Sequence, residues 1–443
     1  MNDDKKPSIL VTLVEAGMGH IVAAQAIYEA LKNKYGEVFD ISACHILRDS
    51  GNKSLIKYEN YLVKNVKMYS SIRGFGYLQI FSMFLLGPRN TLEIVYNTAF
   101  KKQVNALVAE YDKKKPDVII CTHFFTHYCA VKYKQKHNPK VKVVSYCPDN
   151  NVHGWWHVKG DMIYTNNPLA TAEAYKLGFK SGSVKEAFYP TRKQVAQATE
   201  SKQFYREKFN IPADKLAVAI SDGVYAQAKA AKICKKLLKS NLPLTVCMLT
   251  GKDEKIKTKL DRLKETAKPN ITLMTYGFVD NAPELYAACD LFVTKGGPNA
   301  ILDSVMMQTP VIVDFCATPI ESKTCDLFVK KHRCGYYIKS PSKIKRKVEE
   351  LILNPALLRQ FDTSLKFFDK NANGAQQVAD DIASLVLDEK AHKQTLQERE
   401  NEIVDKYYAL RKHGGEQKET FKSRLHSGKN NRKFAKMLEE VNK

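Results

Sequence analysis

Apolar runs alternate with helical patterns along most of the chain. In the first half, runs that are apolar at nearly every position read SILVTLV (8–14), DVIICTH (117–123), KVVSYC (142–147) and DMIYTNN (161–167). A second series reads LAVAIS (216–221), LTVCMLTG (244–251), ITLMTYG (271–277), DLFVTKGG (290–297) and TPVIVDF (309–315). Continuous apolar runs are typical of parallel strands that are covered on both faces. With helices between them, these runs predict an α/β protein built from doubly wound sheets.

The two series of runs predict two domains. They are separated by a polar stretch at 191–215, and 443 residues are enough for two cores. We therefore expect an N-terminal domain over 1–200 and a C-terminal domain over 201–387. From 388 to 443, Lys, Glu and Arg dominate, which predicts a charged helical or partly disordered tail.

The formal net charge of +23 points to an anionic partner, either a nucleic acid or an anionic membrane surface. Solvated lysine faces alone are an alternative source of this charge. Because the positive charge is dispersed and no nucleic-acid-binding module is recognisable, we expect no nucleic acid partner. Ten cysteines without a C-x-x-C pair predict reduced, packed thiols in the cytoplasm. The polar start, MNDDKKPS, predicts no signal peptide, and no run reaches the ~18–20 apolar residues that span a bilayer.

A first glycine turn follows the first apolar run, in LVEAGMGHIVAAQAI (13–27). It is incomplete as a dinucleotide fingerprint, because Val22 stands where a third glycine is needed. A histidine at such a strand end, here His20, can take up a proton near neutral pH. The alternative is that His20 is only a packed residue in the first turn of a helix.

A second glycine turn, FVTKGGPNAILDS (292–304), follows a strand of the second series. Its glycines allow the backbone to approach a ligand, and the helix that starts near Pro298 can stabilise a diphosphate without a metal. Asp303 could accept hydrogen bonds from a ribose, or could instead complement the helix dipole. Lys295 could add positive charge, or could be a solvated side chain at a strand end. A third turn, SDGVYAQ (221–227), could close over the phosphates from the other side.

These turns occur with other motifs in one order. They are GMGH (17–20), CPDNNVHGWW (147–156), YPTR (189–192), YGFVDNAPELYAACDLFVTKGGP (276–298) and LDSVMMQTPVIV (302–313). This order resembles the monogalactosyldiacylglycerol synthase and processive diacylglycerol glucosyltransferase family, which is related to the peptidoglycan N-acetylglucosaminyltransferase. The resemblance covers residues 8 to 360 approximately. It implies a glycosyltransferase-B fold, in which two Rossmann-like doubly wound domains face each other across a cleft. It also implies inverting, metal-independent transfer of a hexose from a UDP-sugar to diacylglycerol, which makes a glycolipid.

The resemblance and the turns together predict the site residues. His20 and Asp149 are the candidate catalytic groups, and which of them is the base and which the orienting group stays open. On the acceptor side we expect Gly17, Gly19, His123, His153 and Trp156. On the nucleotide-sugar side we expect Arg192, Ser221, Gly223, Gly251, Phe278, Val279, Thr294, Lys295, Gly296, Gly297, Pro298, Asp303, Glu321 and Ser322. No metal and no cofactor is expected, because the UDP-hexose is itself the donor substrate.

One stretch departs from the family. Where the family has P-G-Q-E-x-x-N to hold the donor sugar, this chain reads PIESKTCD (319–326). The identity of the donor sugar therefore stays open. Two alternatives also stay open: a transferase of the same fold that uses another lipid acceptor, and a catalytically inactive membrane-binding module.

Two aromatic and histidine-rich stretches have competing interpretations. CTHFFTHYC (121–129) suggests a zinc site, but no second cysteine pair or acidic ligand is nearby. A cleft position for His123 is the better interpretation. Trp155 and Trp156 are the only tryptophans, and they could line an acceptor pocket, lie at a membrane interface or pack in the core.

The stretch from 60 to 92 contains no acidic residue, and basic residues flank its apolar centre, GFGYLQIFSMFLLG (74–87). This centre is too short to span a bilayer and fits a segment that lies in an anionic membrane surface. The alternative is a buried helix pair. The expected membrane contacts are Arg73, Phe75, Tyr77, Leu78, Phe81, Phe84 and Leu85. We therefore expect a peripheral protein on the cytoplasmic face of the cell membrane, with a UDP-sugar, diacylglycerol and anionic lipid as partners.

Overall fold

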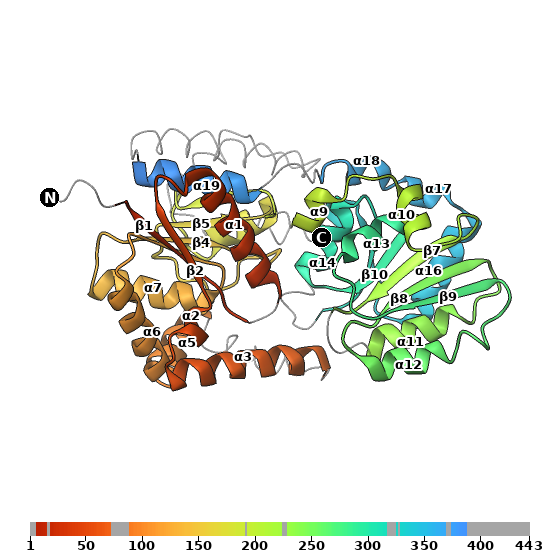
Figure 1. The fold of residues 1–443 in the computed structure, drawn as a ribbon, viewed down its shortest axis with the longest axis horizontal. Coiled ribbons are helices and arrows are strands. Elements are labelled where there is room, and N and C mark those ends of the chain that lie inside the picture. Colours follow the sequence, from red (N-terminus) through yellow and green to blue (C-terminus); the bar gives the residue numbers. More distant parts are fainter. Residues whose placement is uncertain are drawn as a thin grey trace. The chain divides into compact units, whose positions relative to one another are not determined.

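The computed structural model describes residues 6–15, 18–71, 88–190, 193–223, 228–316, 325–326, 328–368 and 374–387. These residues form two compact units (Figure 1). Of the described residues, 6–66, 88–190 and 374–387 belong to the first unit and all others to the second. The predicted tail at 388–443 lies outside the described residues.

The first unit is built on a six-stranded parallel sheet. Its strands, in spatial order, are β2 (Asp40–Cys44), β1 (Ser8–Thr12), β3 (Val118–Cys121), β4 (Lys142–Tyr146), β5 (Met162–Thr165) and β6 (Val184–Glu186). All four residues of β3 are buried, as expected for a central strand covered on both faces.

Helices cover both faces of this sheet. They are α1 (Met18–Tyr35), α2 (Ile46–Asp49), α3 (Lys53–Ser71), α5 (Pro88–Asn97), α6 (Lys101–Lys114), α7 (Phe124–Lys136), α8 (Pro168–Lys176) and α19 (Gly374–Leu387). Alternate side chains of β1 enter different cores, since successive residues of a strand point to opposite faces. Ile9 and Val11 pack with α1 and α19, whereas Leu10 packs with α6 and α7.

The helix α19 belongs to the first unit, although it follows the second unit in sequence. Asp381 of α19 lies 3.3 Å from the buried Lys185 ammonium and accepts a hydrogen bond from the Tyr164 hydroxyl at 3.1 Å. Asp380 accepts a hydrogen bond from the Tyr35 hydroxyl at 2.8 Å. These polar contacts and the apolar face of α19 place 374–387 in the first unit, whereas the sequence assigned that segment to the second domain.

The second unit is built on another six-stranded parallel sheet. Its strands, in spatial order, are β12 (Gly335–Tyr337), β11 (Val311–Phe315), β10 (Leu291–Lys295), β7 (Leu216–Ser221), β8 (Leu244–Leu249) and β9 (Ile271–Tyr276). Its helices are α9 (Lys193–Gln197), α10 (Lys202–Lys208), α11 (Ala228–Leu237), α12 (Glu254–Asp261), α13 (Ala282–Ala288), α14 (Pro298–Met306), α16 (Pro341–Leu353), α17 (Ala356–Arg359) and α18 (Asp362–Leu365). The predicted α/β architecture of two doubly wound domains is confirmed.

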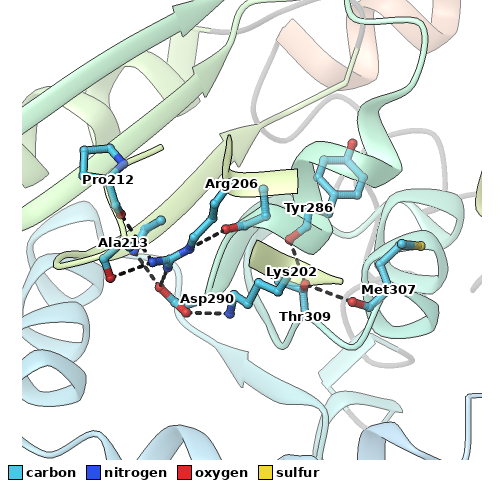
Figure 2. A network of polar contacts seen from close by, with 10 residues as sticks. Lys202, Arg206, Pro212, Ala213, Tyr286, Asp290, Met307 and Thr309 are labelled. Atoms are coloured by element: carbon cyan, nitrogen blue, oxygen red, sulfur yellow. Dashed lines mark hydrogen bonds and ion pairs between the residues drawn. The ribbon is translucent and has the colours of Figure 1, made fainter. Parts of the chain in front are cut away.

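A buried arginine connects α10 to the beginnings of β7 and β10 (Figure 2). The Arg206 guanidinium donates to the carbonyl of Ala288 at 3.1 Å and to the Asp290 carboxylate at 2.6 Å. Asp290 also accepts the backbone N–H of Ala217 at 2.8 Å and pairs with Lys202 at 2.5 Å. This network lies at the amino ends of the strands, so it stabilises the edge opposite the glycine turns.

All ten cysteines are free thiols, and nine of them are buried, as the absence of C-x-x-C pairs predicted. Among the described residues, no helix combines the length and the apolar character that a membrane crossing requires. The predicted membrane contacts, from Arg73 to Leu85, lie outside the described residues.

Candidate functional site

The carboxyl ends of β1, β3 and β4 bring three histidines of the first unit together. His20 follows β1 in the first turn of α1, His123 follows β3, and His153 follows β4. Because neighbouring parallel strands end at the same edge of a sheet, residues after each strand meet there. The ring centroids of His20 and His123 are 4.8 Å apart. Phe124 stacks on His123 at 4.1 Å and meets the edge of His153 at 5.3 Å.

His20 is held by a reciprocal pair of hydrogen bonds with Thr122. Its Nδ1 lies 2.5 Å from the Thr122 carbonyl oxygen, and the Thr122 hydroxyl donates to the His20 carbonyl at 2.8 Å. A carbonyl oxygen only accepts, so we assign the Nδ1 proton to this bond. In the neutral ring, Nε2 then keeps its lone pair. The half-buried His20 thus has the tautomer that a general base requires at Nε2.

His123 is the N-cap of α7 and is 1% exposed. Its Nδ1 accepts the backbone N–H of Phe125 at 3.2 Å. Burial holds the pKa of His123 well below its usual value, and His20 and His153 lower it further. His123 is therefore neutral, with its proton on Nε2, and it adds no positive charge beside His20.

His153 and Asp149 form the third part of the site. Nδ1 of His153 accepts the backbone N–H of Trp155 at 3.3 Å, and its Nε2 lies 3.8 Å from an Asp149 carboxylate oxygen. Burial lowers the pKa of His153, while the Asp149 charge acts in the opposite direction. The side-chain amide of Asn166 donates to the carbonyls of Pro148 and Asp149, at 3.3 and 3.2 Å. These bonds fix the loop that carries the half-buried Asp149 carboxylate.

Other predicted residues of the first unit have different positions. Trp156 is 2% exposed and belongs to a hydrophobic cluster, which fits the packing alternative. Trp155 is half-buried and packs on Tyr96 and Phe124. Gly19 lies in the first turn of α1, and Gly17 lies outside the described residues.

The other histidine of the CTHFFTHYC stretch is structural. His127 is fully buried; its Nε2 donates to the His157 carbonyl at 2.7 Å, and its Nδ1 contacts the Ser145 hydroxyl. Burial lowers the pKa of His127 to about 4. Within the described ranges, no group of three or more His, Cys, Asp or Glu side chains is placed to hold a metal ion.

In the second unit, the predicted turns lie at the carboxyl ends of β7 and β10, which are neighbours in the sheet. Gly223 has a φ of +94°, a conformation that favours glycine. A Cβ atom added to Gly223 would lie 3.5 Å from the Cε atom of Lys295. The Lys295 side chain therefore lies across the β7 turn. Ser221 accepts the backbone N–H of Gly223 at 3.2 Å, which tightens this turn.

Gly296 and Gly297 lie at the start of α14 in different surroundings. A Cβ on Gly296 would lie 3.0 Å from the sulfur of Cys325 and would overlap that of Cys316. A Cβ on Gly297, the N-cap of α14, would meet nothing within 4 Å. Pro298 occupies the first turn of this helix, as predicted. The amino end of α14 thus begins at a glycine with open space around it, directly after a tightly packed one.

The remaining predicted donor-side residues are divided between exposed and buried positions. Phe278 is 54% exposed on the loop after β9, with the Lys252 ammonium 5.4 Å from its ring centroid, and Val279 beside it is half-buried. Gly251 follows β8. Thr294 and Asp303 are buried, at 0% and 1% exposure. Arg192, Glu321 and Ser322 lie outside the described residues.

Three charged residues beside the turns were not predicted as site residues. Asp222 directly precedes Gly223, Asp314 is the fourth residue of β11, and Lys229 is the second of α11. Lys229 lies 3.0 Å from an Asp314 carboxylate oxygen. The sequence carried one signal for them: Asp314 is an acidic residue inside the otherwise apolar run TPVIVDF.

Two family descriptions match the chain. Monogalactosyldiacylglycerol (MGDG) synthase matches residues 20–190, and the glycosyltransferase family 28 C-terminal domain matches residues 221–378. The first match ends where the first unit gives way to the second, and the second match extends a few residues into α19.

Curated relatives cover most of the chain at low identity. The processive diacylglycerol beta-glucosyltransferase of Bacillus licheniformis is 22% identical over 386 residues, which is 86% of this chain and 95% of that protein. The chloroplastic monogalactosyldiacylglycerol synthase 1 of Arabidopsis thaliana is 22% identical over 369 residues, 78% of this chain and 65% of that protein.

Solved structures agree on the fold. MurG of Acinetobacter baumannii matches with a TM-score of 0.56 at 14% identity, covering 84% of this chain and 98% of that chain. HepE of Anabaena in complex with UDP matches with a TM-score of 0.50 at 10% identity, covering 86% of this chain and 99% of that one. At these identities the likeness establishes the fold alone.

Proposed function

We propose that this chain, which matches an MGDG synthase domain over residues 20–190 and a glycosyltransferase family 28 C-terminal domain over residues 221–378, is a UDP-sugar-dependent hexosyltransferase acting on diacylglycerol. The observation that carries this proposal is the succession of the two family matches in one chain. Relatives that align over most of its length are named for the same class of acceptor. The product is a glycolipid.

The first unit supplies the group that takes the acceptor proton. A diacylglycerol hydroxyl is a poor nucleophile, so a base must remove its proton as the hydroxyl attacks the anomeric carbon of the donor. His20 Nε2 has its lone pair free for this step, because Nδ1–H is engaged by the Thr122 carbonyl. We assign the role of base to His20. The Asp149 carboxylate has an orienting role, because it lies 3.8 Å from His153 Nε2 and so orients the His153 ring.

The second unit supplies positive charge for the leaving group. As the new bond to the acceptor oxygen forms, the bond from the anomeric carbon to the diphosphate breaks and UDP carries the negative charge away. Lys295 and the amino end of α14 lie beside the glycine turns and can stabilise this charge without a metal ion. Attack on the face opposite the leaving UDP makes the transfer inverting.

The acceptor is a membrane lipid, so the protein must meet a membrane surface. The basic, acid-free segment 60–92 is the part of the chain that suits an anionic surface. We propose peripheral attachment through this segment on the cytoplasmic face of the cell membrane, with anionic lipid as a partner.

The full chain, incubated with diacylglycerol vesicles and radiolabelled UDP-glucose or UDP-galactose, tests this function. We expect a labelled glycolipid from one of these donors, and more of it when the vesicles contain anionic lipid. No lipid product from either donor contradicts the proposal and favours the alternative of an inactive membrane-binding module. A polyprenyl phosphate in place of diacylglycerol tests the other lipid acceptor.

Two histidine variants separate catalysis from general damage. His20→Ala should lose about 100-fold or more in kcat, because it removes the base. His137→Ala is the matched control, since His137 is a half-exposed residue at the other end of α7, near Asp112. A His20→Ala protein with full activity would remove His20 from the mechanism and leave Asp149 as the base.

A further inference from the structure

The Glu93 carboxylate of α5 binds donors from two helices through one of its oxygens. Oε2 accepts the Tyr128 hydroxyl at 2.9 Å, the Lys132 ammonium at 3.2 Å and the side-chain amide of Asn97 at 2.8 Å. Because Tyr128 and Lys132 belong to α7, this oxygen connects α5 to α7. Burial acts to raise the pKa of the half-buried Glu93, but these hydrogen bonds lower it overall, so the carboxylate is charged at neutral pH.

The other oxygen of Glu93 faces the loop after β4. It lies 3.4 Å from Nε2 of the buried His157. Nδ1 of His157 accepts the backbone N–H of Lys159 at 3.1 Å, so the proton of the neutral ring is on Nε2, the atom that faces Glu93. Burial lowers the pKa of His157 to about 4, although the Glu93 charge acts in the opposite direction. The His157 carbonyl accepts Nε2–H of His127 at 2.7 Å, so His157 is held at both its ring and its backbone.

A short turn connects His157 to the candidate site. The backbone N–H of Trp156 donates to the His153 carbonyl at 3.1 Å, and that of Trp155 donates to His153 Nδ1 at 3.3 Å. Nε2 of His153 in turn lies 3.8 Å from the Asp149 carboxylate. Because these bonds fix the spacing between the two histidines, a displaced His157 also displaces the His153 ring and its contact with Asp149.

A second contact joins α5 to the same loop. Tyr96, which is fully buried one turn after Glu93, meets the Trp155 ring edge-on with 6.0 Å between the centroids. Residues three apart on a helix lie on one face, so α5 turns this face toward the loop. The helix begins at Pro88, directly after the apolar centre 74–87 of the segment that we assign to the membrane surface. The helix that follows the membrane segment is therefore the one that contacts the loop of the candidate site.

We propose that Glu93 is a positioning residue of the acceptor side, which holds His157 from α5 and thereby places His153 and Asp149 for the transfer. Glu93 acts through His157 and is given no contact with either substrate. The inference rests on the proposed function, since it takes the loop after β4 as part of the acceptor site. Because α5 directly follows the membrane segment, Glu93 also connects the part of the chain that meets the lipid surface to the part that orients the acceptor.

Kinetics of glycolipid synthesis on diacylglycerol vesicles test this role. Glu93→Ala removes the oxygen that faces His157, and kcat should fall about tenfold, because a misplaced orienting group affects the chemical step. KM for the UDP-sugar should stay within about twofold of the wild-type value, since the donor turns belong to the second unit. His157→Ala should give the same loss of kcat. His157→Gln keeps an N–H donor for Glu93 and should restore most of kcat, which a general loss of packing would not allow.

Double variants show whether Glu93 acts through the loop. Glu93→Ala combined with His157→Ala should be no slower than either single variant, because both changes break one contact. His153→Ala lowers kcat by itself, and in that background Glu93→Ala should cost less than about twofold, because the ring that Glu93 positions is already absent. Additive losses in both combinations would contradict the proposal.

Asp380→Ala is the matched control, because Asp380 of α19 accepts the same three kinds of donor as Glu93. They are the Tyr35 hydroxyl at 2.8 Å, the Lys34 ammonium at 2.9 Å and the Gln376 side-chain amide at 2.8 Å. Asp380 connects α19 to the last turn of α1 and not to the loop after β4. This variant should lose thermal stability to a similar extent as Glu93→Ala but keep the wild-type kcat.

The outcomes separate this inference from the proposed function. Wild-type kcat in both Glu93→Ala and His157→Ala overturns the inference while leaving the proposed function intact, and so does an equal loss of kcat in Asp380→Ala. If Glu93→Ala does not fold, the comparison of His157→Ala with His157→Gln decides. No glycolipid from the wild-type chain overturns the proposed function and this inference with it.

Discussion

The Glu59 carboxylate accepts the backbone N–H of Glu15 at 3.1 Å and thereby connects α3 to the loop after β1. Glu59 is 1% exposed, and its other oxygen lies 3.4 Å from Arg48, which also pairs with the Glu15 side chain. This loop leads directly into the glycine turn and His20. The helix that runs toward the predicted membrane segment is thus bonded to the segment that carries the candidate base.

We expect Glu59→Leu to lower the free energy of unfolding by about 1.5–3 kcal/mol, because it removes a charged acceptor from the partly buried Glu15 amide and removes one of the two carboxylates that pair with Arg48. Glu59→Gln keeps an acceptor for the amide and should lose less than half of that amount. Thermal unfolding measures both variants. Equal losses for the two variants would show that Glu59 stabilises the fold through its ion pair with Arg48 rather than through its hydrogen bond with the Glu15 N–H.

The reciprocal bonds between His20 and Thr122 give a second prediction. Thr122→Val removes the hydroxyl that holds the His20 backbone but leaves the carbonyl that binds Nδ1. We expect kcat to fall roughly tenfold with little change in KM, since a displaced base affects the chemical step. Thr122→Ser retains the hydroxyl and should restore kcat. A Thr122→Val protein with normal kcat would mean that the Nδ1 bond alone positions the ring.

The strands show how much of the fold the sequence predicts. Each predicted run forms a strand, and all of these strands except β9 are central, where both faces are covered by apolar contacts. The missed strands, β2, β6 and β12, are all at sheet edges. β6 and β12 have three residues each, and β2 exposes alternate positions, so none of them forms a continuous apolar run.

The sequence predicted residues of the candidate site only where a histidine or a glycine turn follows soon after a predicted strand. His20, His123 and His153 each lie soon after an apolar run, and glycine marks the turns of the second unit. The contact between Glu93 and His157 depends on how α5 packs against the loop after β4, which no local pattern gives. The assignment of α19 to the first unit was missed for the same reason, because its contacts there, such as those of Asp380 with Tyr35 and of Asp381 with Lys185, join residues far apart in the sequence.

The Arg206 network gives a prediction on stability alone. Arg206→Met leaves Asp290 without its 2.6 Å partner and leaves three carbonyls, of Ala288, Pro212 and Ala213, without a donor (Figure 2). We expect a loss of about 3 kcal/mol in the free energy of unfolding, as is usual when one partner of a buried pair is removed. Chemical denaturation measures it. Binding of UDP to the folded fraction should be unchanged, since the network lies at the amino ends of the strands.

Buried histidines predict how stability depends on pH. The pKa of His127 in the folded protein is about 4, whereas an unfolded histidine titrates near 6.5. Below pH 6.5 the unfolded chain binds a proton that folded His127 does not, so stability is full above pH 6.5 and falls as pH drops toward 4. For this residue we expect a loss of about 2 kcal/mol between pH 6.5 and 5. His127→Gln should flatten the pH profile of the unfolding midpoint by that amount, and an unchanged profile would contradict the prediction.

The two glycines at the start of α14 separate packing from ligand binding. Gly296→Ala forces a Cβ against the sulfurs of Cys316 and Cys325, so we expect about 1–3 kcal/mol of lost stability together with weaker binding of UDP. Gly297→Ala places its Cβ in open space at a φ of −72°, which alanine adopts without strain. This second variant should melt at the wild-type temperature yet bind UDP at least several-fold more weakly, because its methyl group occupies space that the phosphates need. Thermal melting with and without UDP measures both effects, and wild-type affinity in Gly297→Ala would exclude this helix end as the phosphate site.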